Sequence, residues 1–176
     1  ARPSIQGWIP CRFREHRRGT HVTTNDNEHL RRAIAIARRA RAEGDHPFGA
    51  LLTSASGQVL LTAANSVTTS RDVTAHAEIN LVRLASPIFD TGTLATCTLY
   101  SSTEPCAMCA GAIYWSGIGR VVYALSHDEM RSLYPGKHRE PGIHGRELFE
   151  KTAGAPVIVG PVSEVKPQRP FLRSAN

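Results

Sequence analysis

Apolar residues recur along this chain with two periods, one typical of helices and one typical of strands. A helix is predicted over residues 25–42, because apolar side chains fall on one face at three- and four-residue spacing. These residues are Leu30, Ile34, Ala37 and Ala40. Asn25 or Asp26 is expected to cap the helix, and Gly44 to end it.

Short apolar runs then alternate with further helical stretches. The runs predict strands at 48–54, 58–64, 96–101, 120–124 and 157–159, with the first two forming a hairpin around Gly57. Helices are expected at 74–85, 106–115 and 127–133. Segment 135–146 is rich in proline and glycine and is expected to be an ordered loop or a lid. This order predicts an α/β fold in which helices cover a sheet.

Length and composition favour one globular domain. A chain of 176 residues, 41% hydrophobic and 20% charged, can bury a full core. We expect an N-terminal arm at 1–24, the folded domain at 25–160 and a C-terminal tail at 161–176. We see no apolar run long enough for a membrane span and no apolar centre of a signal peptide at 1–18, so we expect no membrane association and a cytoplasmic location.

The net charge of +6 raises the question of nucleic-acid binding. Residues 1–41 hold ten arginines and three acidic residues, a balance of +7, and the remaining residues hold eleven basic and twelve acidic groups, a balance of −1. The basic charge therefore belongs to the arm and first helix. A solvated arginine-rich face is the favoured interpretation, and a nucleic-acid surface is the alternative.

The candidate chemistry lies in two short motifs. His76-Ala77-Glu78 is followed by Pro105-Cys106-Ala107-Met108-Cys109, the H-x-E…P-C-x-x-C signature of zinc-dependent hydrolytic nucleobase deaminases. His76, Cys106 and Cys109 supply three Zn²⁺ ligands, the number typical of a catalytic site with one position left for water. Glu78 is the candidate catalytic acid and base, taking a proton from water and returning it to the leaving amine. A structural or vestigial zinc site is the alternative.

These and other motifs resemble the cytidine deaminase superfamily, in the branch of bacterial guanine deaminase, yeast-type cytosine deaminase and tRNA adenosine deaminase. The likeness covers roughly residues 25–135 and includes segments 47–50, 65–70, 74–78, 99–106 and 111–115. It implies a three-layer α/β/α sandwich with a five-stranded mixed sheet. It also implies zinc between two helix N-termini, and a homodimer.

The resemblance implies roles for matched residues around the substrate. Asn65 is expected to hydrogen-bond the base, with a turn residue as the alternative, and Phe48 to line the pocket or simply pack in the core. The backbone N–H groups of Ala77 and Cys106 would face the reacting oxygen. Trp115 would line the cavity or a subunit contact, or pack in the core.

The implied substrate is a small-molecule heterocyclic base of guanine, cytosine, isocytosine or aminotriazine type. The guanine branch carries an acidic residue beyond the fourth strand, which the segment 133–138 lacks, while Asp128, Glu129 and Glu140 lie nearby. A tRNA adenosine-to-inosine editor is the second hypothesis, and a non-catalytic zinc module is the third. Glu104 is expected to be structural.

Overall fold

The computed structural model describes residues 21–133 and 142–165. Most of the expected arm, Glu140 and most of the expected tail lie outside these residues. The elements, in chain order, are α1 (Thr24–Ala42), β1 (Gly49–Thr53), β2 (Val59–Ala64), α2 (Val67–Ser70), α3 (Ala77–Ala85), α4 (Thr91–Leu94), β3 (Thr98–Thr103), α5 (Ala107–Ser116), β4 (Arg120–Leu125), α6 (His127–Leu133), α7 (Gly145–Glu150), β5 (Val157–Val159) and the 3₁₀ turn η1 (Ser163–Val165).

The five strands form a single mixed sheet in the order β2-β1-β3-β4-β5. β1 pairs antiparallel with β2 and with β3, whereas β3, β4 and β5 run parallel to one another. The parallel strands are joined through helices, as parallel pairing requires. β1, β3 and β4 are buried along their whole length, as expected of strands covered on both faces.

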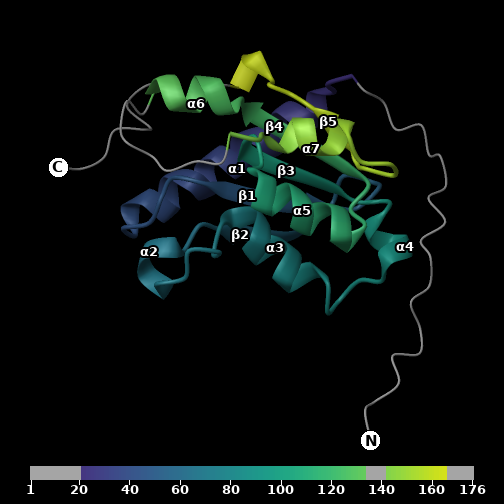
Figure 1. Cartoon of the computed structure of the whole chain (residues 1–176), viewed down its shortest axis with the longest axis horizontal. Coiled ribbons are helices and arrows are strands. Elements are labelled where there is room, and N and C mark those ends of the chain that lie inside the picture. The colour runs from purple at the N-terminus through teal and green to yellow at the C-terminus, as the bar shows by residue number, and fades with distance from the viewer. Residues whose placement is uncertain (1–20, 134–141, 166–176) are drawn as a thin grey trace, which may run out of the picture.

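Helices cover both faces of this sheet (Figure 1), which confirms the predicted three-layer α/β/α sandwich. α1 lies on one face, where Leu30 and Ile34 pack with Leu51 and Val122. α3 and α5 lie side by side on the other face, where Leu81 and Ile113 pack with strand residues. This second layer directs the N-terminal ends of α3 and α5 towards the same edge of the molecule, where the candidate site forms.

The start of α1 differs from the prediction. Thr23 is the cap, and its side chain accepts a hydrogen bond from the backbone of Asp26 while the Asp26 carboxylate accepts one from the Thr23 N–H at 2.7 Å. Asp26 is therefore the third residue of a reciprocal capping box rather than the cap itself. The predicted buried stripe of α1 is confirmed, because all four of its apolar residues are at most 5% exposed.

A buried ionic cluster joins the start of α1 to the sheet. The Asp26 carboxylate accepts hydrogen bonds from the Arg120 guanidinium at 2.8 and 3.0 Å and from the Tyr100 hydroxyl at 2.7 Å. Burial opposes ionisation, but the hydrogen bonds from Arg120, Tyr100 and Thr23 prevail and lower the pKa of Asp26 to about 2. The cluster therefore fixes the register of α1 against β3 and β4.

The five predicted strands and the helices at 74–85, 106–115 and 127–133 are present, with ends that shift by up to three residues. The loop expected at 135–146 ends earlier, because α7 begins at Gly145. Val162 and Val165 are buried against the α1 face of the sheet, so the packed body extends beyond residue 160. Among the described helices, none has the length and apolar character needed to span a membrane.

Candidate metal centre and active site

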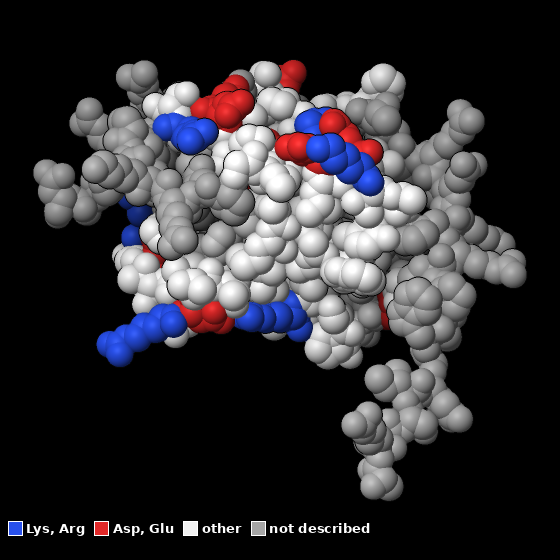
Figure 2. Space-filling view, in the orientation of Figure 1, with Lys and Arg blue, Asp and Glu red and all other residues white. Residues whose placement is uncertain are grey.

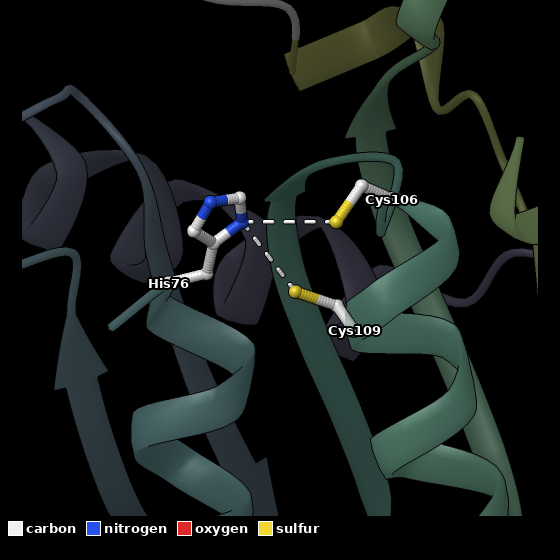
Figure 3. A group of neighbouring side chains, drawn as sticks. All are labelled: His76, Cys106 and Cys109. Atoms are coloured by element: carbon white, nitrogen blue, oxygen red, sulfur yellow. Dashed lines mark hydrogen bonds between the residues drawn. The ribbon is translucent and has the colours of Figure 1, made fainter. Parts of the chain in front are cut away.

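Three potential metal ligands meet at the ends of α3 and α5 (Figure 3). His76 Nδ1 lies 3.7 Å from Cys106 Sγ and 3.6 Å from Cys109 Sγ, and the three ligand atoms are all within 4.8 Å of one another. Cys109 is buried, and the other two side chains are half-buried. The sequence predicted these three residues as ligands, and the fold brings them together.

Helix geometry explains this convergence. His76 is the N-cap of α3 and Cys106 is the N-cap of α5, both in extended conformation. Cys109 lies in the first turn of α5, one turn from Cys106 and on the same side. The positive ends of two helix dipoles therefore point at the cluster, which favours anionic ligands there.

The electrostatics favour a thiolate. A hydrogen bond from Cys109, with a further contribution from His76, outweighs burial and lowers the pKa of the Cys106 thiol to about 4. The same contact with Cys106, together with burial, raises the pKa of Cys109. The contact with Cys106 also raises the pKa of His76 against the effect of burial.

The donor set fits zinc. One imidazole nitrogen and two sulfurs are ligands that Zn²⁺ prefers, and three protein ligands are the number found in catalytic sites. In the part of the chain that the structure describes, the ligand cluster has these three members, so it is not closed by a fourth side chain. The prediction of Zn²⁺ as the cofactor is confirmed by this cluster together with the family match given below.

A carboxylate lies beside the cluster without belonging to it. Glu78, in the first turn of α3, is only 6% exposed, and its Oε2 lies 3.5 Å from Cys109 Sγ. The Ser101 hydroxyl donates a hydrogen bond to Oε1 at 2.6 Å. Burial raises the pKa of Glu78, and the hydrogen bond from Ser101 acts in the opposite direction. Nothing in the strand pattern around Ser101 predicts this role or indicates which carboxylate its hydroxyl meets.

An unpaired amide lies at the end of β2. Asn65 is 2% exposed, its N–H donates to the Phe48 carbonyl at 3.0 Å, and its Oδ1 accepts from the Val67 N–H at 3.1 Å. Its Nδ2 is buried and has no hydrogen-bond partner among the residues that the structure describes. A buried donor without a partner is costly, so the amide is a candidate for contact with a bound group. The half-buried Phe48 is linked to Asn65 by this backbone bond.

The structure does not bring Trp115 to the cluster. Trp115 is near the C-terminal end of α5, is 76% exposed and contacts the Tyr114 ring edge-on at 5.3 Å. This exposure contradicts core packing, while the pocket and subunit-contact roles of Trp115 stay predictions. Ala77, by contrast, is fully buried at the start of α3, whose first turn has no side-chain cap.

Two other acidic residues have structural partners. The Glu104 carboxylate accepts hydrogen bonds from the backbone N–H groups of His127 and Arg146, each at 3.2 Å, and so joins the starts of α6 and α7. Glu129 accepts from both the backbone and the hydroxyl of Ser126.

The chain is similar to known proteins along most of its length. Residues 23–125 match the family model of the cytidine and deoxycytidylate deaminase zinc-binding region. A probable cytosine deaminase of Schizosaccharomyces pombe is 39% identical over 147 residues, which cover 82% of this chain and 89% of that protein. A tRNA-specific adenosine deaminase of Haemophilus influenzae is 38% identical over 129 residues, which cover 73% and 75%. The crystal structure of guanine deaminase from Bacillus subtilis superposes with a TM-score of 0.55 at 40% identity and covers 60% of this chain and 67% of that one.

The sandwich with His76, Cys106 and Cys109 at two helix starts, and with Glu78 beside them, defines a zinc-dependent hydrolytic deaminase. The chain belongs to the cytidine and deoxycytidylate deaminase family.

Proposed function

We propose that this chain removes the exocyclic amino group of a free heterocyclic base of guanine, cytosine or related type, and releases ammonia. In this reaction water adds to the amino-bearing ring carbon and the carbon–nitrogen bond breaks, which leaves a carbonyl group and NH₃. The similarity to proteins named guanine deaminase and cytosine deaminase supports this class of substrate.

His76, Cys106 and Cys109 would hold the zinc, which lowers the pKa of water towards neutrality and so supplies hydroxide. With Cys109 acting as a thiolate ligand, its sulfur has no proton to donate to Glu78. The Oε2 atom of Glu78 is then available to take one proton from water and pass it to the ring nitrogen, and afterwards to take the second proton from the added hydroxyl and pass it to the departing amine. Ser101 keeps Oε1 fixed at 2.6 Å during these transfers.

Asn65 is proposed to hold the base. Its unpaired, buried Nδ2 would donate to a ring acceptor of the substrate, and Phe48 beside it would contact the flat ring. Holding the ring in register contributes orientation, which can account for a large part of an enzymatic rate. The first-turn N–H groups of Ala77 and Cys106 are proposed to face the reacting oxygen, since helix-start amides favour negative charge.

One observation carries the proposal. The buried Glu78 carboxylate lies beside the cluster of three ligand atoms and is not itself a member of that cluster. The test is ammonia release from a panel of guanine, cytosine, isocytosine, adenine and an aminated triazine. Glu78→Ala should keep stoichiometric zinc and lose about 10²- to 10⁴-fold in turnover. Wild-type turnover by this variant would show that Glu78 is not the proton carrier.

A tRNA editor is the second candidate, favoured by the similarity to the tRNA-specific adenosine deaminase. The exposed arginines of α1, among them Arg31, Arg32 and Arg39, lie on the sheet face opposite α3 and α5 (Figure 1), and therefore far from the helices that carry the cluster. This placement favours the free base. Tight, salt-sensitive binding of an anticodon stem-loop, with ammonia released from it alone, would support the editor instead.

We also propose a homodimer and a cytoplasmic location. Val73, Leu84, Ile88, Met108 and Trp115, on or next to α3 and α5, are 39–79% exposed. The face of the molecule that carries these helices is largely uncharged at its centre (Figure 2). An exposed apolar face of this kind is typical of a protein–protein contact. Thiolate zinc ligands suit a reducing compartment.

A further inference from the structure

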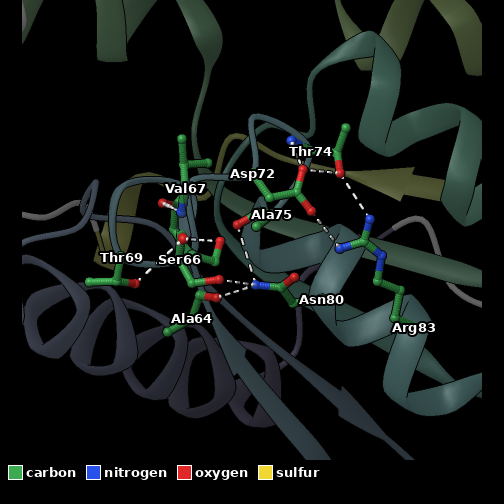
Figure 4. Close-up of polar contacts among 11 residues, drawn as sticks. Ala64, Ser66, Val67, Thr69, Asp72, Thr74, Ala75, Asn80 and Arg83 are labelled. Carbon is green, nitrogen blue, oxygen red and sulfur yellow. Dashed lines mark hydrogen bonds and ion pairs between the residues drawn. The ribbon is translucent and has the colours of Figure 1, made fainter.

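A closed loop connects the proposed base-binding residue to a zinc ligand (Figure 4). The segment 66–75 leaves the end of β2 and returns to the start of α3, and its ends are joined by a hydrogen bond from the Ser66 N–H to the Ala75 carbonyl at 3.0 Å. We call the hydrogen-bonded pair Ser66 and Ala75 the neck of the loop. Asn65 directly precedes this neck in the sequence and His76 directly follows it. The two proposed functional residues are therefore neighbours across the neck, although the loop separates them in the sequence.

One amide group joins both sides of this neck. The Nδ2 of Asn80 donates to the Ala64 carbonyl at 2.9 Å, to the Ser66 hydroxyl at 3.1 Å and to the Ala75 carbonyl at 3.3 Å. The first two acceptors flank Asn65, and the third is next to His76. Asn80 therefore contacts the chain immediately before and after Asn65 and immediately before His76.

The backbone of Asn80 reinforces this arrangement. Asn80 lies one turn into α3, and its N–H donates to the His76 carbonyl at 2.9 Å. Asparagine is a poorer helix former than alanine at an interior position, because its amide competes for backbone hydrogen bonds. Here that amide contacts the loop neck. Helix propensity therefore does not explain why asparagine stands at this position, but its hydrogen bonds to the neck do.

The outer part of the loop is held by other groups. The Arg83 guanidinium donates to the Asp72 carboxylate at 3.3 Å and to the Thr74 hydroxyl at 2.8 Å. Arg83 is on the same helix as Asn80 and about half exposed, but it contacts neither Ala64 nor Ser66. It therefore offers a matched control that loosens the loop without releasing the neck.

We propose that Asn80 is a positioning residue, which sets the distance between the Asn65 amide and His76 and so places the base against the zinc site. The inference rests on the proposed function, because it needs Asn65 to bind the base. A displacement of about 1 Å in such a site can reduce the rate by about 10²-fold, so the loss of three shared hydrogen bonds at the neck should be visible in kinetics.

The first test is a double-mutant cycle on the base that wild-type enzyme turns over fastest. Asn80→Ala should keep one zinc per chain and lose about tenfold or more in kcat/KM, while Arg83→Ala loses less than about threefold. Adding Asn80→Ala to Asn65→Ala should cost little more than Asn65→Ala alone, because residues that act as a unit are non-additive. If the two losses multiply instead, Asn80 does not act through Asn65 and the proposal fails.

The second test does not depend on activity. Amide hydrogen exchange at Ser66 should be about tenfold faster in Asn80→Ala than in wild type, and close to wild type in Arg83→Ala. Unchanged exchange in Asn80→Ala would overturn the proposal even in an active enzyme. If no base yields ammonia with wild-type protein, the proposed function fails while exchange at Ser66 still decides whether Asn80 holds the neck. Asn80→Asp, which keeps the shape of the side chain but replaces its donors, provides a second variant should the alanine variant not fold.

Discussion

The hydroxyl of Ser101 and the carboxylate of Glu78 meet in a hydrogen bond of 2.6 Å, although 23 residues separate them in the sequence. Ser101 comes from the buried strand β3 and Glu78 from the first turn of α3. The bond holds one carboxylate oxygen on the sheet side, while the other faces the sulfur of Cys109. The two oxygens of one carboxylate are therefore in different surroundings, as a positioned proton carrier requires.

Ser101→Ala should therefore reduce kcat by about tenfold to a hundredfold and leave zinc content unchanged, because Glu78 would keep its place in the chain but lose its fixed rotamer. Steady-state kinetics with metal analysis measures this. Ser102→Ala is the matched control, since that buried hydroxyl accepts a hydrogen bond from the Gly49 backbone instead. Equal losses of kcat in the two variants would show that the effect is general to the strand.

Removal of the metal should abolish activity reversibly. A chelator should remove zinc and turnover together, and one equivalent of Zn²⁺ should restore both. Cys109→Ser should lower zinc content well below one per chain, because the open site has only three protein ligands among the described residues. Cys97→Ser should bind zinc normally, since the Cys97 sulfur contacts the Thr93 carbonyl and not the cluster. Normal zinc content in Cys109→Ser would contradict the coordination that we describe.

Asp26 should make stability depend on acid pH. Its pKa is about 2 in the folded protein against an ordinary value of 3.8, so its charge stabilises the fold above pH ~4, and this contribution is lost as pH falls towards about 2. The shift corresponds to about 2.5 kcal/mol. Urea unfolding of the metal-free protein between about pH 5 and pH 2 should show this loss.

The Asp26→Asn variant provides the comparison with wild type. Asp26→Asn should be less stable at neutral pH by about 3–5 kcal/mol, because Arg120 is left buried without a counter-charge. It should also lack the acid-dependent part of the wild-type curve, and parallel pH profiles for the two proteins would refute the assignment.

Gly49 should not tolerate a side chain. A Cβ at this position would lie 2.5 Å from the Ala33 carbonyl oxygen and 2.6 Å from the Ala37 nitrogen, so Gly49→Ala would push α1 away from β1. A loss of about 1–3 kcal/mol in the free energy of unfolding is expected from thermal or urea denaturation. Gly142→Ala, where no heavy atom of the described residues lies within 4 Å, should change stability by no more than about 0.5 kcal/mol. A neutral Gly49→Ala would mean that α1 packs less closely than described.

Local patterns predicted most of the fold. The buried stripe of α1, the hairpin after it and the strand at Val157–Val159 could be predicted, because in each of them the spacing of apolar residues is evident within a few positions. α7 was missed because its predicted surroundings are rich in glycine and proline, and Leu148 and Phe149 alone make too short an apolar signal. The cap of α1 was misplaced because both partners of a capping box, Thr23 and Asp26, are good caps.

The candidate site likewise contains residues that could be predicted from the sequence and residues that could not. His76, Cys106 and Cys109 could be predicted because each half of the motif is contiguous and the chemistry of the ligands is specific. The contacts of Ser101 and Asn80 could not, because they depend on which strand and loop face α3 after folding. For Trp115 the sequence leaves pocket, subunit contact and core packing open, because α5 has apolar residues on every side and does not indicate which face is exposed.

Trp115 gives the last prediction, on the state of association. In the described part of the chain its ring lies next to Tyr114 and is 76% exposed, which is unusual for an apolar side chain of this size on the surface of a single chain. If α3 and α5 form the contact between two copies, Trp115→Glu should shift the protein from dimer to monomer, because it places a charge in an apolar interface. Light scattering after gel filtration measures the mass, and metal analysis checks that the zinc site is intact. Arg39→Glu, an exposed change on α1 at the opposite face, is the control and should leave the mass unchanged. A wild-type protein that is monomeric at micromolar concentration would refute the dimer, and a Trp115→Glu variant that remains dimeric would place the contact elsewhere.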